Sequence, residues 1–168
     1  FPVDDGELAF LKLFVLAHRH PPLDRLVARA LPAMEAFARG AEQSCHLGVY
    51  DRGNVTILAQ VNNPGKISFS IRRGSRVSLV DTGSGHALLA FQSPQRRTEM
   101  LAAHEAVEGE VPLDEAQMSA TLASVRKLGY WQGDSLQSFG ITDISIPVMG
   151  TGGAALAVLT CPFIRRID

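Results

Sequence analysis

The sequence contains a run of small residues, Gly83-Ser84-Gly85, directly after Asp81-Thr82 and before the apolar segment His86–Phe91. This pattern predicts a loop that opens a helix, where the first amides lack intrahelical partners. Such amides, together with the positive end of the helix dipole, attract a carboxylate or a phosphate. The run lacks the lysine of a phosphate-binding loop and the full dinucleotide motif, so taken alone it favours tight packing over ligand binding.

Two carboxylates, Asp134 and Asp143, are further candidates for ligand contact. Asp143 opens the apolar segment Asp143–Met149, where a buried charge is costly unless a partner compensates for it. It is therefore expected either to meet a hydroxyl or amine of a ligand, or to lie exposed at the strand end and bind a neighbouring turn. Asp134 is predicted to be a solvated loop residue.

No catalytic or metal-binding constellation is recognisable in the sequence. The five histidines lack the helical pair and third ligand that a zinc site requires, so we predict neither a metal nor a cofactor. Cys45 and Cys161 fall in predicted strands, where a thiol usually packs as a small hydrophobe. The residues thus favour a binding or interaction domain over an enzyme. The alternative is a small thiol-dependent enzyme or redox sensor that uses Cys161 or Cys45.

The composition limits the class of protein. A chain of 168 residues with 46% hydrophobic content can bury one substantial core. A net charge of −1 provides no basic field for nucleic acid, and no apolar run approaches the roughly 20 residues of a membrane-spanning helix. Two unpaired cysteines fit a reducing cytoplasm. Because the chain opens at Phe1, we expect it to be a piece of a longer protein.

Hydrophobic spacing predicts both helices and strands. Pro21-Pro22 should separate the first two helices, Pro32 should kink the second, and Asp114 and Gly129 should cap the last one. The predicted helices are Glu7–His18, Leu23–Gln43, His86–Phe91, Pro94–Ala103 and Asp114–Lys127. The predicted extended segments are Cys45–Tyr50, Val55–Val61, Ile67–Ile71, Arg76–Val80, Asp143–Met149 and Ala154–Cys161. Turns rich in glycine join the first two and the last two of these segments as hairpins. The pattern predicts one α+β domain with an antiparallel sheet.

The order of features from Glu7 to Ile167 resembles the effector-binding domain of the IclR family of bacterial transcription regulators. The resemblance rests on five motifs in sequence: His46-Leu47-Gly48-Val49, Arg73-Gly74-Ser75-Arg76 before Thr82–Ala90, Arg126-Lys127-Leu128-Gly129-Tyr130, Gly140–Val148 and Ala157-Val158-Leu159-Thr160. It implies a curved antiparallel sheet flanked by helices, similar to GAF and PAS domains, with a small effector on the concave side. Residues 1–20 would be the end of an interdomain linker helix, and residues 21–168 the effector-binding domain.

The resemblance also implies the partners. In the family a winged helix-turn-helix precedes this domain, so contact with operator DNA is expected only through that missing N-terminal part. Because regulators of palindromic operators need two reading heads, we expect a homodimer or homotetramer. The expected function is that of a cytoplasmic sensor, which binds a small organic acid or related metabolite without converting it and thereby shifts the arrangement of subunits. An interaction domain without any ligand is the remaining alternative.

Carried over position by position, the family's pocket maps onto eight residues of this chain. The amides at the glycine-serine run would form the floor of the cavity and hold a carboxylate, while Lys66 lies beside one wall. The eight residues are Phe69, Gly83, Ser84, Gly85, Asp134, Asp143, Leu159 and Cys161.

This pocket departs from the family at three positions. Many relatives carry cysteine at the position of Asp143, and some carry serine at those of Leu159 and Cys161. An ionised Asp143 would repel a second anionic group about 4 Å away by roughly 4 kcal/mol at an effective dielectric of 20. The resemblance therefore implies a partly apolar or aromatic acid with a polar tail in place of a small oxo-acid.

Overall fold

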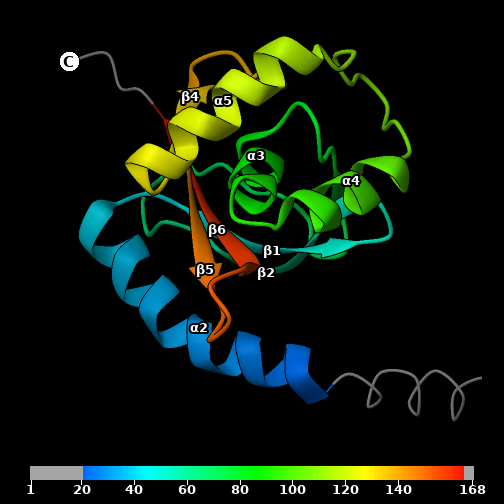
Figure 1. The fold of residues 1–168 in the computed structure, drawn as a ribbon. Coiled ribbons are helices and arrows are strands. Elements are labelled where there is room, and N and C mark those ends of the chain that lie inside the picture. Colours follow the sequence, from blue (N-terminus) through cyan, green and yellow to red (C-terminus); the bar gives the residue numbers. More distant parts are fainter. Residues whose placement is uncertain (1–20, 165–168) are drawn as a thin grey trace, which may run out of the picture.

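One antiparallel sheet of six strands organises residues 21–164, the part of the chain that the computed structural model describes. The strand order is β3-β2-β1-β6-β5-β4, and the predicted α+β fold with a curved antiparallel sheet is confirmed (Figure 1). The elements are α2 (Pro21–Ala41), β1 (Cys45–Asp51), β2 (Asn54–Val61), β3 (Arg76–Val77), α3 (Gly83–Ala90), α4 (Pro94–Ala102), α5 (Glu115–Leu128), β4 (Trp131–Asp134), β5 (Ile141–Met149) and β6 (Ala155–Ile164). The predicted helix Glu7–His18 and the segment 1–20 lie outside the described residues.

The two faces of the sheet carry different helices. Helix α2 packs against β1 and β2 on one face, and α3 packs against β5 and β6 on the other, with α5 against α3 (Figure 1). Side chains of a strand alternate between these faces. Along β6, Ala157 belongs to the core cluster of α2, whereas Val158 belongs to the cluster of α3. We refer to these sides as the α2 face and the α3 face.

Local signals in the sequence set several boundaries correctly. The Asp114 carboxylate caps α5 by accepting hydrogen bonds from the amides of Ala116 and Gln117. Gly129 ends the same helix at φ 87°, a left-handed conformation that glycine adopts without a β-carbon clash. Helix α2 continues through Pro32, and both predicted hairpins form.

Two local predictions are wrong. The alternating segment Ile67–Ile71 is a loop and not a strand, because β2 pairs instead with Arg76–Val77. Ile67 is 75% exposed, so the alternation has no buried face to stabilise it. Asp134 lies at the end of strand β4 rather than in a loop, since the short edge segment Trp131–Asp134 pairs with β5.

Helix α3 approaches its surroundings too closely for a side chain at two positions. A β-carbon at Gly85 would overlap the backbone of Leu79, and one at Gly83 would overlap the ring of Trp131. Every residue of α3 except His86 is buried. The small residues therefore serve the packing that their composition favours, and they bring the start of α3 down onto the sheet.

We expect Gly85→Ala to destabilise the domain by roughly 1–3 kcal/mol or more, because the Leu79 backbone cannot give way as a flexible side chain would. The matched control is Gly40→Ala in α2, where a β-carbon meets nothing within 4 Å. That change should stabilise the helix by about 0.5–1 kcal/mol. Urea denaturation of both variants measures the difference, and equal effects would contradict this account of α3.

Candidate functional site

The first turn of α3 is held by hydroxyl groups. The N-cap Thr82 accepts a hydrogen bond from the Gly85 amide at 3.1 Å. The Ser84 hydroxyl is hydrogen-bonded to Thr160 of β6 at 2.8 Å. Since Gly83 and Ser84 occupy the first two positions of the helix, their amides have no intrahelical carbonyl to bind. The turn therefore keeps the donor character that the sequence predicts.

A polar row crosses the α3 face beneath this turn and consists of Ser84, Thr160, Ser145 and His46. Thr160 is hydrogen-bonded to Ser145 at 2.8 Å and pairs with His46 across β1 and β6. His46 is 5% exposed, and its Nδ1 has no hydrogen-bond partner among the described residues. Burial lowers the pKa of His46 to about 4, so the imidazole is neutral at physiological pH. An orphaned buried nitrogen costs free energy, which a ligand can recover.

The indole of Trp131 lies against Gly83, one of the residues that were expected to form the floor of a cavity. Its ring fills the space where a side chain of Gly83 would lie, and Ser145 Oγ is 2.9 Å from the same point. Neither of the two pockets described below is lined by Gly83, Ser84 or Gly85. In this conformation Trp131 closes the predicted floor at Gly83. The sequence did not predict this closure, because a local pattern gives no information on which distant side chain lies against the turn.

Asp143 is half-buried at the register position opposite Gly133 of β4. It lies two residues before Ser145 on β5 and so shares the α3 face with the polar row. Burial raises the pKa of Asp143 to about 6, and a hydrogen bond from Ser135 opposes part of that rise. The carboxyl therefore changes its charge close to physiological pH and can either donate or accept a hydrogen bond.

The structure does not bring Leu159 and Cys161 to the polar row. Leu159 pairs with Leu47 and packs in the core cluster of α2, and strand alternation places Cys161 on the same face. Thr160, between them, is the β6 residue that meets Ser84. The sequence analysis did not identify Thr160 or Ser145 as site residues. Thr160 lies one position from each of the predicted residues Leu159 and Cys161, and a shift of one position along a strand moves a side chain to the other face.

Neither thiol is activated. Burial raises the pKa of both Cys45 and Cys161 to about 11, which keeps them protonated at physiological pH. The Cys45 thiol donates a weak hydrogen bond to the Met34 carbonyl. Because the thiolate is the nucleophile, this environment argues against the thiol-dependent enzyme or redox sensor.

Phe69 and Asp134 lie at the periphery. Phe69 is half-buried in the loop after β2, where its carbonyl accepts a hydrogen bond from Gln60 Nε2. The Asp134 carboxylate accepts a hydrogen bond from Thr142 across β4 and β5. The eight predicted positions are thus distributed among the α3 turn, the α3 face of β5 at Asp143, the α2 face and two peripheral segments.

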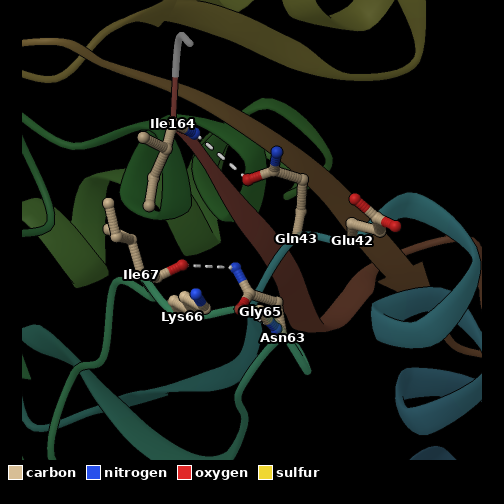
Figure 2. Close-up of a pocket in the computed structure, with 7 residues that line it drawn as sticks. All are labelled: Glu42, Gln43, Asn63, Gly65, Lys66, Ile67 and Ile164. Carbon is tan, nitrogen blue, oxygen red and sulfur yellow. Dashed lines mark hydrogen bonds between the residues drawn. The ribbon is translucent and has the colours of Figure 1, made fainter.

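An open pocket of about 380 Å³, the Lys66 pocket, lies at the end of β6. Its lining residues are Glu42, Gln43, Asn63, Gly65, Lys66, Ile67 and Ile164 (Figure 2). Gln43 Oε1 accepts a hydrogen bond from the Ile164 amide, and Asn63 Nδ2 donates one to the Ile67 carbonyl. Figure 2 shows the side chains of Ile164 and Ile67 facing each other across the opening.

The Lys66 pocket continues the face that carries the polar row. Ile164 follows Thr160 by four residues in β6 without a register shift between them, so both point to the α3 face. The distance along the strand from Thr160 to Ile164 is roughly 13 Å. Lys66 is the one cation among the seven lining residues. The pocket therefore offers the Lys66 ammonium group, the Glu42 carboxylate, two amide side chains and two apolar walls.

Between 21 and 164, no group of three or more His, Cys, Asp or Glu side chains is arranged to hold a metal ion. In the same range, no helix is both long and apolar enough to span a bilayer.

Comparison with known families gives one match, which spans most of the chain. The family model described as the bacterial transcriptional regulator IclR C-terminal domain matches residues 23–166. No curated protein matches the chain. The chain spans 54% to 66% of the length of the first four solved regulators that it resembles.

Solved structures share the fold at low sequence identity. An IclR homolog from Microbacterium hydrocarbonoxydans, complexed with 4-hydroxybenzoate, is 24% identical at a TM-score of 0.76, covering 94% of this chain and 66% of its own. The C-terminal domain of the E. coli regulator KdgR is 23% identical at a TM-score of 0.70, covering 85% and 84%. A double mutant of the PobR inducer-binding domain from Acinetobacter, complexed with 3-hydroxybenzoic acid, is 21% identical at a TM-score of 0.62, covering 76% of each chain.

We expect Asp143→Asn to stabilise the domain at pH 8 by about 1–2 kcal/mol. The folded-state pKa lies above the ordinary 3.8, so the native state holds the proton more tightly and loses stability as pH rises from about 4 through about 6. The amide relieves this loss, and its advantage should vanish at pH 4. Urea denaturation at the two pH values measures the effect. The control is Glu35→Gln, which changes an exposed side chain on α2. An advantage independent of pH would contradict the raised pKa.

Proposed function

We propose, from the premise that this chain belongs to the IclR family of bacterial transcriptional regulators through its C-terminal domain, that it senses a small organic acid without converting it. The observation that carries the proposal is the Lys66 pocket. A cation beside apolar walls, at the edge of a buried polar row, suits a carboxylate attached to an apolar body. The volume of about 380 Å³ lies in the range of small-molecule sites.

The chemistry of the walls supports an aromatic or partly apolar acid. Ile67 and Ile164 can contact a ring from both sides, and Gln43 Nε2 remains as a donor because its Oε1 binds the chain. Two of the similar structures hold hydroxybenzoates, which combine a ring, a carboxylate and a hydroxyl.

Part of the set of eight residues predicted from the sequence remains in the proposed site. Gly83, Ser84, Gly85 and Asp143 share the α3 face with the Lys66 pocket without lining it, so we propose them for the deeper part of the site, beside the polar row. Phe69 stays as an outer residue, whereas Asp134 lines a second pocket beside the start of α5. We propose Thr160 and Ser145 in place of Leu159 and Cys161, since the latter pair faces α2.

We further propose that binding acts through an oligomer in the cytoplasm. A ligand can alter operator affinity only through unequal affinity for two arrangements of the subunits. Contact with operator DNA would come from a winged helix-turn-helix outside this sequence, and the net charge of −1 agrees with a domain that does not grip DNA itself.

Sedimentation velocity of the purified chain at micromolar concentration should give a species of two or four times 18.1 kDa. Addition of a bound acid should change its sedimentation coefficient or its dissociation constant, because coupling requires unequal affinity for two arrangements. A monomer at all accessible concentrations, with and without ligand, would contradict regulation through the oligomer of this domain.

Calorimetric titration tests the acid specificity. We expect benzoate, 3-hydroxybenzoate or 4-hydroxybenzoate to bind, and 4-hydroxybenzyl alcohol, which lacks the carboxylate, to bind about tenfold more weakly or not at all. Lys66→Gln should weaken binding of the acid about five- to tenfold, because the ammonium group is lost while the side chain keeps most of its length.

The matched control is Lys127→Gln, which removes the same charge from the exposed end of α5. Affinity should then stay unchanged. Equal weakening by both variants would indicate a long-range charge effect, and failure of all three carboxylates to bind would overturn the proposed ligand class.

A further inference from the structure

A second pocket, the Asp81 pocket, lies among the start of α3, the start of α5 and strand β4, and has a volume of about 220 Å³. Trp131 lines it with the same indole that covers Gly83. His86 lies beside the indole, with ring centroids 5.9 Å apart. No residue of the Lys66 pocket contributes to this second hollow, so the two can be tested independently.

The Asp81 pocket is acidic, whereas the lining of the Lys66 pocket contains one cation, Lys66, and one carboxylate, Glu42. Three aspartates, Asp81, Asp114 and Asp134, line the Asp81 pocket, and none of its lining residues is a lysine or an arginine. Asp114 caps α5 and Asp134 accepts a hydrogen bond from Thr142, so these two carboxylates already have partners. The pocket thus repels the organic acids proposed for the other site.

Asp81 is the carboxylate that remains incompletely satisfied. It is 8% exposed, and its Oδ2 accepts a hydrogen bond from the Val111 amide at 2.8 Å. Its Oδ1 has no hydrogen-bond partner among the described residues. A buried anionic oxygen without a donor costs free energy, which a cation carrying N–H groups would recover.

The remaining walls select the kind of cation. The face of an indole attracts an organic cation electrostatically, and Val111, Leu113 and Leu136 add exposed apolar surface. A metal ion needs several oxygen ligands, and no group of three or more ligating side chains occurs in the described range. The chemistry therefore favours an ammonium group on an apolar body.

We propose that the Asp81 pocket binds a small organic ammonium ion, with its N–H groups directed to Asp81 and its apolar part against Trp131. This ligand class differs in charge from that of the proposed effector. The domain would then respond to two metabolites of opposite charge, each at its own site.

Fluorescence provides a readout specific to this pocket, because Trp131 is the single tryptophan of the chain. Benzylammonium chloride should change its emission in a saturable way at constant ionic strength. Benzyl alcohol has the same shape without the charge, and it should bind about tenfold more weakly. Sodium benzoate should not compete with benzylammonium. Equal affinity for the amine and the alcohol, or no saturable change with the amine, would overturn the proposal.

Asp81→Asn identifies the partner of the ammonium group. The carboxamide oxygen can still accept from the Val111 amide, so the fold should persist while affinity for benzylammonium falls about tenfold or more. Glu35→Gln on α2 removes an equal charge from the opposite side of the sheet and should leave affinity unchanged. Unaltered binding in folded Asp81→Asn would exclude Asp81 as the partner. The comparison of the two probes on the unmodified chain decides the proposal even where this variant does not fold.

Discussion

The close contact between the start of α3 and the sheet is the constraint on which the rest of the site depends. Gly85 lies against the Leu79 backbone and Gly83 against Trp131, so the helix can descend only because these positions lack side chains. A buried helix end brings unpaired amides into the core, and buried polar groups need partners. The Gly85 amide donates to the Thr82 hydroxyl, and the buried hydroxyls of Ser84, Thr160 and Ser145 are hydrogen-bonded to one another. The tight packing and the buried polar groups at the start of α3 therefore both follow from the close contact of this helix with the sheet.

Burial also decides which groups on this surface carry charge. The same desolvation keeps His46 neutral and pushes the pKa of Asp143 towards the physiological range. It holds both thiols in their protonated form, so the chain has cysteines without an activated nucleophile. The polar row thus offers hydrogen bonding and little fixed charge, and fixed charge enters only at its margins. These properties suit reversible recognition better than covalent chemistry.

The two pockets of the domain differ in the charged groups that line them. Lys66 and Glu42 place one cation and one carboxylate in the first, whereas three aspartates and an indole line the second. Trp131 connects the second pocket to the start of α3, because its ring contacts Gly83 and also borders the Asp81 pocket. A single side chain thereby relates the pocket to the turn that the family resemblance marks as the anion-holding loop.

The sequence by itself determined the features that depend on neighbours in the chain. Turn glycines predicted the two hairpins, and Asp114 and Gly129 predicted the ends of α5. The order of the motifs predicted the family and its curved sheet. Tertiary structure decided what depends on distant residues. The alternation at Ile67–Ile71 formed no strand because no partner or buried face was present, and the edge segment Trp131–Asp134 became a strand by pairing with β5. In the candidate site, Ser84 and Asp143 lie on the α3 face, whereas Leu159 and Cys161 lie on the opposite face, since one step along a strand reverses a side chain. The covering of Gly83 by Trp131 and both pockets arise from side chains far apart in sequence, whose meeting no local pattern encodes.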